Sequence, residues 1–201
     1  MRFGYVALIA AWWTVGVLAF VFWPEEEIVR APGALATQAP SQRPLTDAKS
    51  WIFHDKFLVT PLAAFELRAR VLSKKKYWFG REASLAPVDL ALGWGRMSDQ
   101  QIVEALDITQ HSRWYFFRAK HLPIPMAEIA ASSSNMHMIP ASDEIESQLG
   151  SLRRGDILQL SGFLVRVRAD DGWNWRSSLS RTDSGAGACE VVWVEKLSVE
   201  E

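Results

Sequence analysis

The chain has few of the residues with which proteins build metal sites and disulfides. Its 201 residues include one cysteine, Cys189, so no disulfide can form within the chain and a multi-cysteine zinc site is excluded. It also has no H-E-x-x-H pair and no aspartate-rich calcium loop. We therefore expect no metal site, and no motif indicates a cofactor.

An excess of charge of one sign is also missing. The formal net charge is −1, so no overall field draws the chain to nucleic acid, and we expect no nucleic-acid partner. Glycines at Gly93 and Gly95 precede an expected helix from Ser98 to Asp107, but they match neither a Walker A loop nor a dinucleotide fingerprint. This turn either packs Trp94 on the core or forms an anion nest beside Arg96.

One long stretch contains no charged residue. As a helix, residues 3–23 would span about 30 Å, the thickness of a bilayer core. Arg2 precedes the stretch and Glu25–Glu27 follows it, so the positive-inside rule places the rest of the chain outside the cytoplasm. The nearest A-x-A pattern, Ala34–Ala36, lies too far beyond the apolar run for signal cleavage, which favours an uncleaved single-pass anchor over residues 1–23.

After the anchor, the composition changes twice. Residues 24–50 are rich in proline and alanine and predict a semi-extended linker, and residues 51–198 carry the patterns of one globular domain. We expect an α+β protein, with the transmembrane helix followed by a mostly antiparallel, β-rich domain that forms a curled sheet or partly open barrel with a few short helices. Strands do not alternate with long helices, so a parallel sheet is not expected.

Several local patterns place the elements of this domain. A short strand from Phe57 should end at Pro61, and Gly162 should mark a bulge within a later strand. The other expected elements are a period-two strand at 65–71, a strand at 113–118, helices at 125–132 and 142–149, a hairpin turn at 170–172 and a last strand at 189–197.

Cys189 has two interpretations. As a nucleophile it would need a histidine, and His137 is the candidate. The order His54, Asp89, Cys189 superficially resembles that of chymotrypsin-like cysteine proteases, but Glu190 follows the cysteine where that family has glycine. Alternatively, Cys189 is a small residue that packs at the start of a strand. The second interpretation is favoured, so enzymatic activity stays open and a non-enzyme is expected.

The ten tryptophans suggest contact surfaces as well as core packing. Aromatic rings beside arginines can stack on ligands, whereas the same tryptophans could fill the core while Arg181 and Asp183 pair across a turn. The candidates for ligand or partner contact are Trp94, Arg96, Trp173, Trp175, Arg176, Arg181 and Asp183.

Three stretches, APVDLALGWGRMSD, SNMHMIPA and WRSSLSRTDSGAGACEVVWVE, resemble blocks of an uncharacterised family of bacterial membrane-anchored proteins. The resemblance covers most of residues 51–197. It implies a bacterial source and one folded unit after the anchor, and it supplies no activity, ligand or fold.

These observations predict a binding or assembly module at the bacterial inner membrane, with its C-terminal domain outside the cytoplasm, as an accessory subunit of a membrane complex. Its partners would be lipid, through residues 3–23, and another protein. Two alternatives stay open: a membrane-tethered hydrolase or transferase that uses Cys189 with His137, and a ligand sensor built on the turn at residues 93–96.

Overall fold

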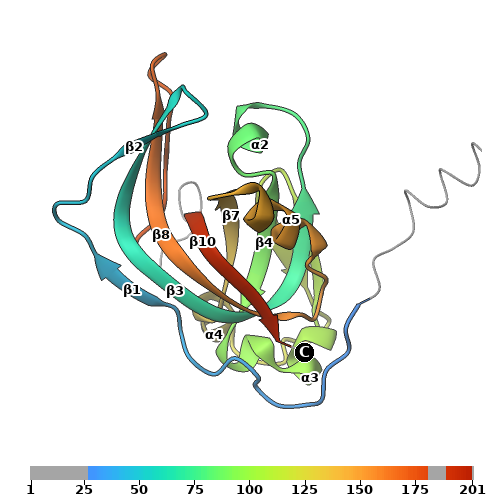
Figure 1. Ribbon diagram of the computed structural model, residues 1–201. Helices are drawn as coiled ribbons and strands as arrows, with labels where there is room; N and C mark the ends of the chain where they lie inside the picture. The colour runs from blue at the N-terminus through green and yellow to red at the C-terminus, as the bar shows by residue number, and fades with distance from the viewer. Residues whose placement is uncertain (1–26, 181–188, 201) are drawn as a thin grey trace, which may run out of the picture.

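The computed structural model describes residues 27–180 and 189–200, and its centre is a ring of five strands (Figure 1). In ring order these are β3 (Phe57–Lys76), β4 (Val88–Gly93), β7 (Ser133–Pro140), β10 (Glu190–Glu200) and β8 (Ile157–Ala169). The ring closes because β3 pairs with β8 along its first part and with β4 along its last part. The result is a barrel, built from antiparallel pairs except for the parallel pair β7–β10.

The five barrel strands can be numbered 1 to 5 by their order along the chain, which is β3, β4, β7, β8 and β10. Around the ring their order is then 1-2-3-5-4. The helix α5 (Asp143–Ser151) lies between the third and the fourth. This is the topology of the OB fold, a five-stranded Greek-key barrel. The expected α+β class, with a β-rich domain and few short helices, is therefore confirmed. The parallel pair was not expected; it arises because the long connection from β7 to β10 brings the chain back in the same direction.

The barrel is filled by alternating apolar side chains. Along β3, Phe65, Leu67 and Val71 point inward and meet Leu90, Met136 and other apolar residues of the remaining barrel strands. The expected break at Pro61 is wrong, because β3 runs through this proline as one strand of 20 residues. Pro61 lies where the pairing with β8 becomes irregular, a position at which a strand tolerates a missing N–H donor.

Gly162 marks a close approach of two strands. A Cβ atom built at this position would lie 1.9 Å from the carbonyl oxygen of Trp193 on β10. The register shift itself lies in β10, between Val194 and Lys196, opposite the predicted position. The absence of a side chain at Gly162 therefore leaves space for the bulge in the adjacent strand β10.

The connections carry short elements. The expected helix from Ser98 to Asp107 is replaced by a 3₁₀ turn, η1 (Gly95–Ser98), followed by α3 (Gln100–Glu104), whose cap is Asp99 and not Ser98. Ser98 is buried and accepts a hydrogen bond from the Ala36 amide instead. The remaining elements are β1 (Ser41–Pro44), β2 (Trp51–Phe53), α2 (Arg81–Leu85), the hairpin β5 (Asp107–His111) with β6 (Trp114–Arg118), α4 (Met126–Ala131) and β9 (Asn174–Arg176).

Residues 27–45, here called the strap, run along one end of the barrel rather than standing off as a spacer (blue in Figure 1). Glu27 pairs with Arg154 at 3.1 Å, and the Ile28 amide donates to the Arg154 carbonyl at 2.8 Å. Ala36 is fully buried, and β1 pairs with β3. The prolines keep this segment extended, so its backbone groups are free to bond to the barrel.

The predicted anchor at residues 3–23 lies outside the described residues. Within the described part of the chain, no helix has the length and apolar character needed to cross a bilayer.

Candidate functional site

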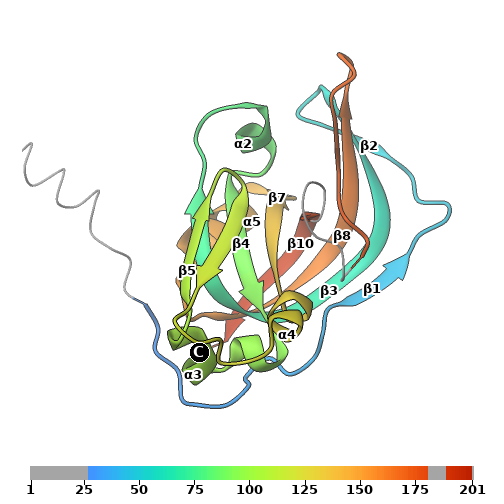
Figure 2. The ribbon, with the colours of Figure 1, turned by 180° about the vertical axis from the view of Figure 1, so that it is seen from behind.

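A cluster of charged side chains lies on the outer face of β4 and β7, beneath the β5–β6 hairpin that Figure 2 shows in front of β4. Asp89 and His137 are direct partners across the two strands. The Asp89 carboxylate is fully buried and accepts a hydrogen bond from Arg113 Nη1 at 2.6 Å, and His137 Nδ1 lies 3.0 Å from the same carboxylate oxygen. A buried carboxylate is tolerated when a cation compensates it, as Arg113 does here.

Arg113 is held in an uncommon backbone conformation. Ser112 and Arg113, the two central residues of the hairpin turn, have φ angles of 52° and 66°. Both values fit a type I′ turn, in which asparagine and glycine are the usual residues. Two hydrogen bonds hold the turn: the Arg113 amide donates to the Tyr77 hydroxyl, and the Asn135 side-chain amide donates to the Arg113 carbonyl, each at 3.0 Å. The fold therefore stabilises a conformation that places this guanidinium over Asp89.

Aromatic rings complete the cluster. The guanidinium carbon of Arg113 lies 3.8 Å from the centre of the Tyr77 ring and 5.8 Å from that of Trp175. The His137 ring lies 4.8 Å from the Trp175 ring. Burial raises the pKa of the Tyr77 phenol above its ordinary value of 10.0, and the nearby Asp89 charge acts in the same direction. Tyr77 therefore stays a neutral hydrogen-bond acceptor for the turn.

Cys189 lies beside this cluster. It directly precedes β10, and its sulfur is 4.0 Å from both the Asn135 side-chain nitrogen and the Arg113 carbonyl oxygen. Since Glu190 pairs with Met136, Cys189 is next to Asn135 and on the face that carries His137, two residues further along β7. The predicted pair thus shares one face of the sheet, and the imidazole faces Asp89.

The other predicted contact residues do not form one site. Trp173 lies beside Trp175, with ring centres 6.0 Å apart, and both pack against a second apolar cluster outside the barrel. Trp94 is buried in the barrel core, and Arg96 forms an exposed ion pair with Glu128. Arg176 is exposed on β9. Arg181 and Asp183 lie outside the described residues.

The Gly93–Arg96 turn is packed and has no room for an anion nest at its first glycine. A Cβ atom at Gly93 would lie 2.4 Å from the Met97 carbonyl oxygen. The Trp94 amide donates to the Ser132 carbonyl, and the Gly95 amide to the Ala36 carbonyl of the strap. These N–H groups are thus already engaged within the fold.

Sequence reasoning missed Arg113 and Tyr77 and gave Asp89 only a passing role. The available signal was an aspartate inside the apolar run VDLAL and a histidine between two methionines in NMHMI. A charged or titratable residue within an apolar strand usually has a buried partner. Arg113 carried no such signal, because only the tertiary fold brings the β5–β6 turn over β4.

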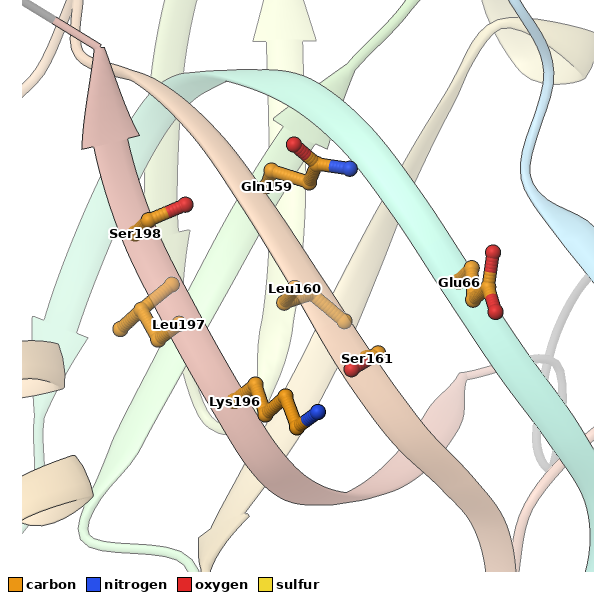
Figure 3. A pocket seen from close by; sticks show the side chains of 7 residues that line it. All are labelled: Glu66, Gln159, Leu160, Ser161, Lys196, Leu197 and Ser198. Carbon is orange, nitrogen blue, oxygen red and sulfur yellow. The ribbon is translucent and has the colours of Figure 1, made fainter.

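Two surface hollows lie elsewhere. One, of about 410 Å³, crosses β3, β8 and β10 and is open to solvent, with Glu66 and Lys196 among its polar residues (Figure 3). The second, of about 350 Å³, lies between the β2–β3 turn, α2 and the start of α5. Across residues 27–180 and 189–200, no three His, Cys, Asp or Glu side chains gather as a metal ion would require.

The fold and the cluster define an OB-type barrel whose β4–β7 face carries buried Asp89 and His137 with the partly buried Arg113 beneath the chain's own hairpin. No protein-family model, curated protein or solved structure matches the chain.

Proposed function

We propose that this chain is a binding or assembly module anchored in a bacterial inner membrane, with its barrel outside the cytoplasm, where it serves as an accessory subunit of a membrane complex. The observation that carries the proposal is the strap. The predicted span ends at residue 23, and the chain is bonded to the barrel from Glu27 onward. A chain that crosses a bilayer at 3–23 would hold the barrel close to the membrane in a restricted orientation.

Side-chain hydrogen bonds attach the strap to the barrel in addition to its backbone contacts. The Arg30 amide and the buried Arg70 guanidinium share the Gln100 side-chain oxygen, and the Arg30 side chain donates to the Gly155 carbonyl at 3.1 Å. Arg68 bonds to the Leu35 carbonyl and forms a two-pronged ion pair with Glu200. Two-pronged arginine–carboxylate contacts fix geometry as well as charge.

A topology measurement tests the location. In a Cys189→Ser background, Lys120→Cys puts a single thiol on an exposed residue of the domain. A membrane-impermeant maleimide should label this thiol in cells whose outer membrane alone has been opened. A cytoplasmic protein with an exposed cysteine, labelled only after lysis, is the control. Labelling of Lys120→Cys that also needs lysis would overturn the proposed orientation.

The assembly role is tested by mass analysis of the full-length chain, extracted gently from its native membrane. Partners that copurify in a fixed ratio are the expected result. A chain that always emerges as a lone monomer would contradict the role of an accessory subunit.

One observation favours a second candidate, the tethered hydrolase or transferase. An Asp89 carboxylate oxygen lies 3.0 Å from His137 Nδ1, without the geometry of a hydrogen bond, and Cys189 lies on the same face. A carboxylate, an imidazole and a thiol are the groups that such catalysis combines. The candidate requires a reactive thiol. If iodoacetamide modifies Cys189 only after the protein is denatured, this candidate is eliminated.

A further inference from the structure

The loop after β3 ends in two adjacent aromatic residues that point into solvent. Trp78 is 77% exposed and Phe79 is 93% exposed, whereas the preceding Tyr77 is fixed under Arg113. Large aromatic side chains are costly to leave in water, and exposed ones mark contact sites when they gather. Lys75 precedes them and is exposed, so positive charge lies next to the two aromatic rings, whereas the Lys76 ammonium lies near Gly150 of α5. We call residues 75–79 the knob.

The smaller hollow lies close to the knob along the chain and has complementary chemistry. Its volume is about 350 Å³, which lies in the range of pockets that hold a small ligand and has room for an aromatic ring. Its apolar lining comes from Phe53, Ala83, Leu85, Pro87, Pro140 and Ala141. Asp143 and Glu146, both exposed on the first turns of α5, supply negative charge at its edge.

From this complementarity we propose that a second copy of this chain occupies the hollow, with Trp78 of each copy seated in the hollow of the other. Knob and hollow are separated by only a few residues, at 75–79 and 83–87. A two-fold axis between them would bring each knob over the partner's hollow and match lysine with acidic residues in both contacts. The inference extends the proposed assembly role by naming the partner.

The area available is that of a small, reversible interface. Each Trp or Phe side chain buries roughly 150–250 Å² when it is covered, so four rings give roughly 600–1,000 Å². The concave hollows that receive them add a smaller area. The total therefore lies near the lower limit of specific interfaces, at about 1,200 Å².

Insertion of the knob into the membrane of the anchor fits less well. The strap bonds to the barrel near Gly95 and Gln100, beyond the Gly93 end of β4, whereas the knob precedes the opposite, Val88 end. Figure 1 shows α3 and α2 at these two ends of the barrel. Six residues of β4 separate them by about 20 Å. The comparison with the membrane rests on the proposed function, because it assumes an anchor at residues 3–23. The complementarity of knob and hollow does not depend on that anchor.

The test uses the full-length chain in mild detergent, with its mass measured by light scattering over a concentration series. The wild type should be a dimer. Trp78→Ala and Phe79→Ala should raise the dissociation constant by about 30-fold or more, as expected for aromatic residues at the centre of an interface. Ser84→Trp, which fills the hollow from its edge, should do the same. Phe116→Ala, at an exposed aromatic residue on β6, is the matched control and should leave the dimer unchanged.

A photo-crosslinker at position 79 identifies the contact directly. In a mixture of ¹⁴N- and ¹⁵N-labelled chains, mixed-isotope crosslinks should join position 79 to peptides that contain residues 83–87 or 140–146. A wild-type monomer, a dimer that Trp78→Ala leaves intact, or crosslinks to lipid or within one chain would each overturn the inference. A dimer lost in Trp78→Ala would support it even if the topology measurement placed the domain in the cytoplasm, so the two proposals fail separately.

Discussion

At the scale of single residues, Asp89 is the buried negative charge on which the candidate site is built. Its carboxylate contacts both Arg113 and His137, and each comes from a different part of the chain. Removing one partner of a buried ion pair leaves the other charge uncompensated, which costs more than the pair itself contributes. The cluster is therefore most sensitive to the loss of this one negative charge.

Asp89→Asn keeps the side-chain shape and removes the charge. We expect it to lower the free energy of unfolding by about 3–5 kcal/mol, measured by urea denaturation at neutral pH. Asp171→Asn is the matched control, since Asp171 forms an exposed ion pair with Arg81, and its unfolding midpoint should not move. Equal midpoints for the two variants would show that the cluster does not stabilise the fold.

At the scale of elements, the strap depends on a glycine of the barrel. A Cβ atom at Gly155 would lie 1.9 Å from the carbonyl oxygen of Ile28, and Gly155 has a φ of 92°. Two effects would therefore act together in Gly155→Ala: backbone strain and a clash with the strap. Gly172→Ala isolates the effect of backbone strain, because Gly172 has a φ of 87° and nothing lies within 4 Å of a Cβ atom at that position.

Gly155→Ala should release the start of the strap, whereas Gly172→Ala should not. Both variants should lose about 1 kcal/mol of stability from the positive φ. Only Gly155→Ala should speed hydrogen exchange at the Ile28 amide, by about tenfold or more, because local opening of the strap becomes easier. Equal exchange rates in the two variants would contradict the idea that this contact fixes the strap.

At the scale of the whole molecule, OB-type topology raises the question of nucleic-acid binding. OB folds bind oligonucleotides on the face of their second and third strands, here β4 and β7. In this chain the β5–β6 hairpin covers that face, and the net charge is −1. Fold alone does not determine function, and in the described part of the chain the hairpin occupies the face on which an OB fold would stack bases.

We therefore expect no binding of single-stranded DNA or RNA at about 150 mM salt. Fluorescence anisotropy of a labelled 20-nucleotide strand should stay constant up to about 100 µM protein, the weak limit of non-specific binding. A salt-dependent rise below that concentration would contradict this expectation and would indicate a basic surface that the barrel presents elsewhere.

The sequence by itself determined the local features. The α+β class, the β8–β9 turn at 170–172, the Ser142 cap of α5 and the aromatic strand at 114–118 follow from residue patterns that act within a few positions. The errors came where distant parts of the chain meet. Pro61 lies inside a strand and the proline-rich segment packs as the strap. In both cases the position depends on contacts with distant barrel residues, which composition does not predict.

The tertiary structure alone decided the ring closure and the site. Closure depends on β3 pairing with β8 about 100 residues later, and the cluster depends on a hairpin turn that carries Arg113 over β4. Buried charges must find partners wherever the fold supplies them, so Asp89 and His137 indicated that partners exist but not which residues they are. Local secondary structure depends on neighbouring residues. The partner of a buried charge is determined only when distant parts of the chain come together in the fold.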